Sequence, residues 1–166
     1  MSALSKVLAP NLIAARALNP LQPLLALALR WYVSWQFLKA GWLKLNSWDQ
    51  TLWLFENEYR TPLLPPSAAA MLGTAGELLF PILLIVGFAS RLGALGLFAV
   101  NAMAVVSYAH VLLEEGMEAA LAQHVLWGVM LLTVALYGPG KLSLDYLLGR
   151  SRTATGSGRE AAPVAI

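Results

Sequence analysis

The chain has 166 residues, of which 58% are hydrophobic and only 12% are charged, and its formal net charge is +2. A soluble domain of this size cannot bury so much apolar surface, and soluble domains carry about twice this share of charged residues. The composition therefore predicts an integral membrane protein. No basic run suggests a nucleic-acid partner, and the absence of cysteine excludes thiol–disulfide chemistry by the chain itself.

The N-terminal residues 1–22 carry Lys6 and Arg16 among apolar residues. We expect them to form a cytoplasmic arm that lies on the membrane surface or frays. A first membrane span is predicted at about residues 23–45, because its length as a helix matches a bilayer core of about 30 Å. One stripe of this helix holds Arg30, Ser34, Phe37, Gly41 and Lys44.

A second stripe of the same helix, about 100° away, is rich in tryptophan. It holds Trp31, Trp35, Leu38 and Trp42. The first interpretation of this stripe is an anchor in lipid or at the membrane interface, where tryptophan is enriched. The alternative is a wall on which a flat cofactor stacks, which makes Trp31 and Trp35 candidate ligand-binding residues.

The connector from residue 46 to residue 66 alternates aromatic and acidic residues at helical spacing. This pattern predicts a short amphipathic helix in the membrane interface, either a surface anchor or a lid over the bundle.

The second span is predicted at about residues 67–88 and contains Glu77 near its middle. A carboxylate at that depth costs roughly 2.5–3.5 kcal/mol unless it is partnered or protonated.

We expect Arg30 to be the partner of Glu77, which gives one buried polar centre. The structural interpretation is an ion pair that fixes how the helices pack. The functional hypothesis is a centre that binds a substrate anion or a quinone carbonyl, or that relays protons.

The third and fourth spans are predicted at about residues 92–113 and 119–137. Asn101 lies near mid-membrane and is a candidate ligand-binding residue together with His124. His110, His124 and Glu114 form a candidate metal site, although their spacing matches no established metal motif. An imidazole that binds a quinone oxygen, or two interface histidines wetted by headgroup water, are the alternatives. Haem ligation is disfavoured because both histidines lie shallow in the membrane.

After the fourth span, residues 141–148 are expected to form a second short interfacial helix capped by Ser143. Residues 149–166 are rich in small and polar residues and are expected to be a disordered cytoplasmic tail. Six basic residues fall on one side of the four predicted spans: Lys6, Arg16, Arg91, Lys141, Arg150 and Arg152. This bias predicts that both termini are cytoplasmic. The predicted fold is an all-α up-and-down bundle of four transmembrane helices with two interfacial helices.

Several motifs together resemble the DoxX family of small bacterial inner-membrane proteins. They are Arg30, the Gly41-Trp-Leu-Lys44 segment, the series Glu77, Gly87 and Arg91, and the segment from Gly138 to Asp145. The resemblance covers roughly residues 21–148, which is nearly all of the chain that is expected to be ordered. It implies a four-span protein of the bacterial inner membrane. Some members resemble membrane subunits of a thiosulfate–quinone oxidoreductase, and others resemble membrane partners of enzymes in oxidative-stress or thiol defence.

Three functions follow as expectations. The first is an accessory membrane subunit of a redox, oxidative-stress or sulfur-metabolism system that interacts with quinone. No catalytic residue is assigned, and any enzymatic role would be as part of a quinone-linked oxidoreductase complex. The second is a non-catalytic scaffold that recruits a partner enzyme, and the third is a transporter of small solutes or metal ions. The expected partners are the lipid bilayer and either a second protein or further copies of the chain.

Overall fold

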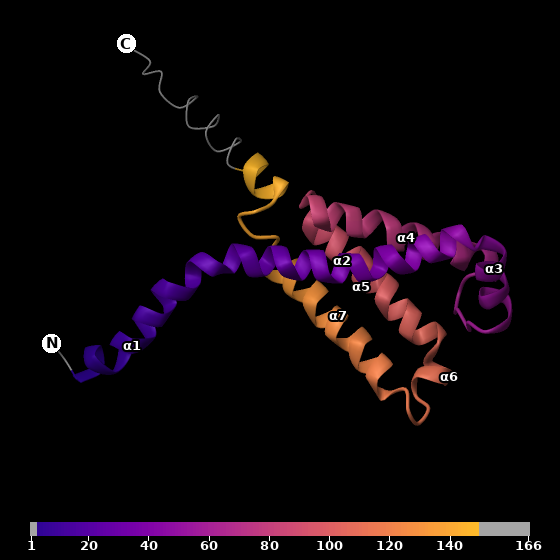
Figure 1. The fold of residues 1–166 in the computed structure, drawn as a ribbon, viewed down its shortest axis with the longest axis horizontal. Helices are drawn as coiled ribbons and strands as arrows, with labels where there is room; N and C mark the ends of the chain where they lie inside the picture. Colours follow the sequence, from indigo (N-terminus) through magenta and orange to yellow (C-terminus); the bar gives the residue numbers. More distant parts are fainter. Residues whose placement is uncertain (1–2, 150–166) are drawn as a thin grey trace, which may run out of the picture.

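The computed structural model describes residues 3–149, and these residues form helices joined by short turns (Figure 1). The elements are α1 (Ala3–Leu18), the 3-10 turn η1 (Asn19–Leu21), α2 (Gln22–Asn46), α3 (Trp48–Asn57), α4 (Pro66–Val86), α5 (Ser90–Ser107), α6 (Ala109–Leu112) and α7 (Glu118–Tyr137). Residues 144–149 are also helical. No strand occurs within this part of the chain.

Four of these helices are long and apolar enough to cross a membrane. They are α4, α5, α7 and a continuous helical stretch from Pro10 to Asn46 that includes α2. The four-span prediction is therefore confirmed, and the chain is a multi-pass membrane protein. The large apolar side chains exposed on these helices, such as Leu79 and Leu136, are those that a bilayer covers.

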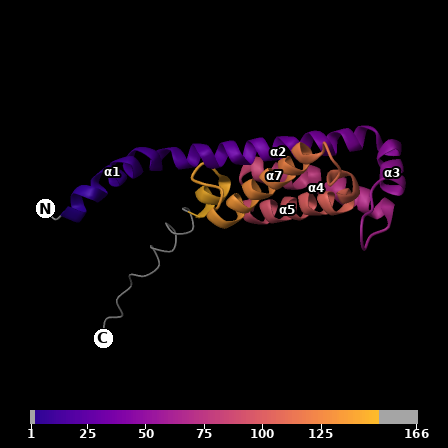
Figure 2. The same cartoon turned by 90° about the horizontal axis from the view of Figure 1, so that it is seen from below.

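The N-terminal arm is helical. Helix α1 continues through η1 into α2 and projects from the bundle (Figures 1 and 2). Its expected position on the cytoplasmic membrane surface stays a prediction. Pro20 stands at the start of the 3-10 turn, where its fixed backbone angle is accommodated without loss of a helical hydrogen bond. The two first residues and the tail from residue 150 onward lie outside the described part of the chain.

The main packing partners are α2 with α4, α5 with α7, and α4 with α5. A layer of apolar side chains joins all four spans and is fully or almost fully buried: Val33, Phe37, Leu84, Ala94, Leu97, Leu131, Val134 and Ala135. We call the end of the bundle that carries α3 the α3 end, and the opposite end the Gly87 end. The layer fills the half of the bundle nearer the Gly87 end.

The third span ends earlier than residue 113. Helix α5 stops at Ser107, and a separate short helix, α6, follows. The carbonyl of Ser107 accepts a hydrogen bond from the backbone N–H of Arg60 in the connector. The last residue of α5 thus bonds to the connector. His110 consequently lies in α6, beyond the membrane-spanning helix, and not within the span.

The Gly87 end is closed by two charged side chains that cap neighbouring helix ends. Arg30 of α2 donates to the carbonyl of Leu84 in the last turn of α4, at 2.8 Å. The carboxylate of Asp145 accepts from the backbone N–H groups of Ala89 and Ser90, at 2.8 Å each, at the start of α5. A cation at a helix C-terminus and an anion at a helix N-terminus each complement the helix dipole.

The predicted cap by Ser143 is confirmed. Its hydroxyl oxygen accepts a hydrogen bond from the N–H of Tyr146 at 3.2 Å, three residues further on, as an N-terminal cap does. The adjacent Asp145 N–H bonds to the carbonyl of Gly87 at 2.9 Å. The segment after α7 is thereby attached to the turn between α4 and α5.

Candidate functional site: a cavity at the α3 end

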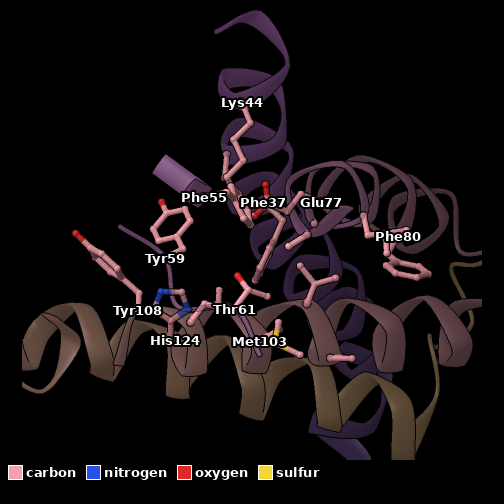
Figure 3. Close-up of a pocket in the computed structure, with 18 of the residues that line it drawn as sticks. Phe37, Lys44, Phe55, Tyr59, Thr61, Glu77, Phe80, Met103, Tyr108 and His124 are labelled. Atoms are coloured by element: carbon pink, nitrogen blue, oxygen red, sulfur yellow. The ribbon is translucent and has the colours of Figure 1, made fainter. Parts of the chain in front are cut away.

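A cavity of about 550 Å³ lies at the α3 end, between α2, α4, α5, α7 and the connector (Figure 3). Its wall is mostly apolar and contains small residues of two helices, Ala69 and Gly73 of α4 and Gly96 of α5. Leu72 and Met103 belong to the same wall and are 60% and 37% exposed. The cavity is therefore not fully enclosed by the described residues.

A partly buried ion pair forms one side of this cavity. Lys44, in the last turn of α2, donates a hydrogen bond to Oε1 of Glu77 in the middle of α4. Glu77 is only 5% exposed. Side chains of an α-helix lean toward its N-terminus, so the ammonium group of Lys44 extends from the end of α2 back toward the bundle interior.

Gly41 brings the two helices of this pair close together. A Cβ atom at residue 41 would lie 2.9 Å from the Cβ of Glu77 and 3.0 Å from Cγ of Leu78, closer than side chains tolerate. Glycine at this position therefore allows α4 to approach α2 where it carries its carboxylate. The expected stripe on α2 faces the bundle, since Arg30, Ser34, Phe37 and Gly41 are buried.

The expectation that Arg30 is the partner of Glu77 is wrong. Both side chains are buried as predicted, but they lie at opposite ends of the apolar layer. The guanidinium of Arg30 donates to the carbonyls of Leu84 and Leu142 at the Gly87 end. The partner of Glu77 is Lys44, whose long side chain reaches the carboxylate from the last turn of α2.

His124 and Asn101 lie together, as two candidate residues of one site. The amide nitrogen of Asn101 donates to the backbone carbonyl of His124 at 2.9 Å, and its amide oxygen lies 2.8 Å from Nδ1 of the imidazole. A carbonyl can only accept, so the amide orientation is fixed, and Nδ1 must carry the proton. His124 also contacts the indole of Trp127 edge to face, at 5.0 Å between ring centroids.

The connector covers the mouth of the cavity with aromatic side chains. Phe55 of α3 packs edge to face on Tyr59, and Tyr59 packs in the same way on Tyr108, with centroid distances of 4.9 and 5.2 Å. Burial raises the pKa of the Tyr59 phenol, and the neighbouring Tyr108 and Glu77 raise it further. The phenol at the mouth is therefore neutral at physiological pH and can donate a hydrogen bond.

Three polar atoms in cavity-lining residues are buried and have no hydrogen-bond partner among the described residues. They are Oε2 of Glu77, Nε1 of Trp127 and Oγ1 of Thr61. An unsatisfied buried polar group costs about 1–3 kcal/mol, so such groups are expected to have a partner. Their residues line the cavity, but these three atoms have almost no accessible surface of their own. Trp127 was not predicted as a site residue, because one tryptophan in an apolar span is indistinguishable from a lipid anchor.

Two other expectations are not met. Trp31 and Trp35 are 50% and 53% exposed on the outer surface of α2 and do not line the cavity, so they fit the anchor interpretation. Within residues 3–149, no group of three His, Cys, Asp or Glu side chains is placed to hold a metal ion. His110 instead packs against Tyr108, and it forms no metal cluster with His124 and Glu114.

Comparison with known proteins gives two matches. The family model of DoxX matches residues 25–110. A Haemophilus influenzae protein described as an uncharacterized protein is 32% identical over 130 residues, which cover 74% of this chain and 82% of that protein. No solved structure matches the chain significantly. The matched region includes α4 and α5 and most of α2, and so it includes the Lys44–Glu77 pair.

Proposed function

Because this chain belongs to the DoxX family of membrane proteins, we propose that it is an accessory membrane subunit of a redox or stress-defence system. In this proposal the cavity at the α3 end binds the ring of a lipid-soluble quinone. A partner protein exchanges electrons with that quinone, because the chain has no cysteine from which to build a thiol–disulfide couple of its own.

One observation carries the proposal: a largely apolar cavity that is lined in part by the polar residues Lys44, Tyr59 and His124. Its volume of about 550 Å³ lies within the range of roughly 300–1,000 Å³ typical of small-molecule sites. A solid bundle interior, as expected for a pure scaffold, would contain no such space. A flat ring with two polar oxygens matches an apolar wall that also includes these polar side chains.

Each polar wall group has a role in holding such a molecule. The phenol of Tyr59 and the remaining N–H groups of Lys44 can donate to a ring oxygen, while Glu77 and His124 can hold a proton next to it. A quinone, when bound, supplies a carrier of two electrons and two protons. The polar groups of the chain position the ring and exchange protons with it.

The packed layer argues against the transporter alternative. Below the cavity, Val33, Leu84, Leu97 and Leu131 are all fully buried apolar side chains that close the bundle. A charged solute would have to cross this layer without polar contacts, which is very costly. The structure of the described helices thus favours a site that is entered and left from the same side.

We place the protein in the bacterial inner membrane. The chain enters and leaves the bundle at the Gly87 end, and in our proposal this end faces the cytoplasm. The support is the basic residues on that side, including Arg91 and Lys141, against the acidic Glu114, Glu115 and Glu118 on the other. Fusion of a reporter enzyme to the loop at residue 116 tests this orientation. Activity of a periplasm-specific reporter there is the expected result.

Binding of decylubiquinone to the protein in lipid nanodiscs, measured by calorimetric titration, tests the quinone site. Saturable binding is expected for the wild type and for Ala75→Leu, which adds bulk to the exposed, lipid-facing side of α4. Gly73→Leu adds the same side chain from the same helix into the cavity, and should weaken binding at least tenfold. Equal binding by the two variants, or no saturable binding by the wild type, would contradict the proposal.

A further inference from the structure

We infer that the outer face of α2 binds a membrane-spanning helix of a partner protein, and that this helix presents an aspartate or glutamate to Lys39. The outer face is formed by Trp35, Lys39, Trp42 and Leu43, which follow one another at helical spacing. The inference gives a chemistry to the partner of the proposed accessory subunit, so it rests on that role. It does not depend on the quinone cavity, whose wall contains none of these four residues.

The other described spans leave this face uncovered. Figure 2 shows α2 along one edge of the bundle, with α4, α5 and α7 on one side of it. Lys39 is exposed, and Trp35, Trp42 and Leu43 are each more than half exposed. The outer face is therefore available to lipid or to a partner.

Lys39 lies near the middle of the membrane. Helix α4 has 21 residues, a length of about 31 Å that matches a bilayer core. Gly41 packs against the middle of this helix, because a Cβ at Gly41 would lie 2.9 Å from the Cβ of Glu77. Lys39 precedes Gly41 by two residues, so it lies within about 3 Å of that level along the axis. Since helical side chains lean toward the N-terminus, its ammonium group extends away from the α3 end.

An ammonium group at this depth requires an anion. Charged side chains are costly in lipid, and those within membrane spans almost always face the protein interior or pair with another group. Lys39 is exposed, and the ion pair found within residues 3–149 joins Lys44 to Glu77 instead. A carboxylate from another molecule at the same depth would neutralise Lys39.

A second copy of this chain does not supply that carboxylate. In the four described spans the acidic residues are Glu77, which is buried and paired with Lys44, and Glu118, which begins α7 at the α3 end. In a symmetric pair through the outer face, two Lys39 side chains would meet and repel each other. Lipid phosphates lie at the membrane surface and not at this depth. A different protein with an acidic membrane span fits the charge.

The tryptophans beside Lys39 suit a contact between helices. Trp35 precedes Lys39 by four residues and Trp42 follows it by three, so both are its neighbours on the helix surface. Tryptophan is enriched among the residues that contribute most to protein interfaces. In the complex, the two indole rings would contact the partner helix instead of lipid and shield the ion pair.

Site-specific photocrosslinking of the full-length chain in its native cells tests the inference. The photoreactive residue benzoylphenylalanine replaces Leu43 on the outer face or, as a control, the exposed Val129 in the middle of α7. A crosslink to another protein is expected from position 43 and not from position 129. Mass spectrometry should place the crosslinked peptide in a membrane span that contains Asp or Glu.

Variants of Lys39 show whether its charge holds the partner. Lys39→Met should lower the yield of this crosslink about tenfold or more, because the carboxylate of the partner is left unpaired. Lys39→Arg keeps the positive charge and should retain most of the crosslink. Lys39→Glu should lose the crosslink, and changing the acidic residue of the partner to Lys should then restore it. This restoration distinguishes a lost ion pair from a misfolded variant.

The outcomes separate this inference from the proposed function. A crosslinked span without Asp or Glu, or a yield that is unchanged in Lys39→Met, would overturn the acidic partner helix and leave the accessory role standing. Crosslinks from position 43 to a second copy of the chain or only to phospholipid would overturn the inference as well. The titration of decylubiquinone tests the quinone site independently of all these results.

Discussion

Arg30 in α2 donates a hydrogen bond to the backbone carbonyl of Leu142, 112 residues later in the chain. The same guanidinium holds the carbonyl of Leu84 at the end of α4. One fully buried side chain therefore connects the first span, the second span and the segment that follows the fourth span. Arginine suits this role because its planar group directs several N–H donors in fixed directions.

Replacing Arg30 by Met should lower the free energy of unfolding by roughly 3 kcal/mol, because hydrogen bonds from a charged group contribute about 1.5–3 kcal/mol each. Amide hydrogen exchange in residues 138–149 should rise at the same time. Lys39→Met removes a positive charge from an exposed position of the same helix and is the control. Equal stability of the two variants would show that the carbonyl contacts of Arg30 contribute little. Arg30→Lys should not restore stability, since an ammonium group does not reproduce the fork of donors.

The capping carboxylate of Asp145 should make the stability depend on pH. Burial alone would raise its pKa, but the N–H groups of Ser90 and Ala89 and the charge of Arg30 hold the pKa below its ordinary value. A lowered pKa means that the stabilisation is complete at neutral pH and declines as the pH falls below about 4, the value for an unfolded chain.

Thermal unfolding in detergent at several pH values checks this expectation. Asp145→Asn should be less stable than the wild type at pH ~7, and the difference should shrink as the pH approaches ~3. Asp49→Asn, on the exposed side of α3, is the matched control and should leave the difference from the wild type independent of pH. A constant deficit of Asp145→Asn over this range would contradict the capping role of the carboxylate.

Substitutions at two glycines with a positive φ can separate two costs to the free energy of unfolding. One is the cost of the backbone angle, and the other is the cost of crowding by neighbouring side chains. Gly87 has φ +76° and a Cβ there would lie 2.6 Å from Nη1 of Arg30 and 2.7 Å from Cβ of Ser143. Gly116 has φ +90° and open space around it. Gly116→Ala should cost about 1 kcal/mol for the backbone alone. Gly87→Ala should cost clearly more in the same unfolding measurement, and an equal cost would mean that the junction adjusts freely.

The ion pair at the cavity can be tested by a double-mutant cycle. Lys44→Met leaves a carboxylate buried without its cation and should destabilise the protein by about 3 kcal/mol. Combining it with Glu77→Gln should cost less than the sum of the two single changes. Arg30→Met and Glu77→Gln should add within about 0.5 kcal/mol, because these residues share no contact. Coupling of Arg30 rather than Lys44 to Glu77 would contradict the arrangement described above.

Helical periodicity in the sequence was sufficient to predict the fold and the buried face of the first span. Arg30, Phe37 and Gly41 lie on that face because the 3.6-residue repeat places them there, whatever their partners are. The cap by Ser143 was also predictable, since capping depends on residues that are close in the chain.

The contacts that residues of this face make with other helices could not be predicted in the same way. Lys44 shares the stripe with Gly41 and lies one turn beyond it, which was the available signal for its pairing with Glu77. Choosing between Lys44 and Arg30 required the length and direction of the side chains and the position of the turn near Leu142. The cavity was beyond prediction, because it results from small residues of two helices and an aromatic connector that meet only in three dimensions.

The apolar layer below the cavity has an electrical consequence. Since Leu84, Leu97 and Leu131 close the bundle with fully buried side chains, a molecule entering at the α3 end travels through only part of the membrane. A proton taken up at Glu77 or His124 and released to the same side moves no net charge across the membrane voltage. Turnover at this site should therefore generate no steady current in a planar bilayer.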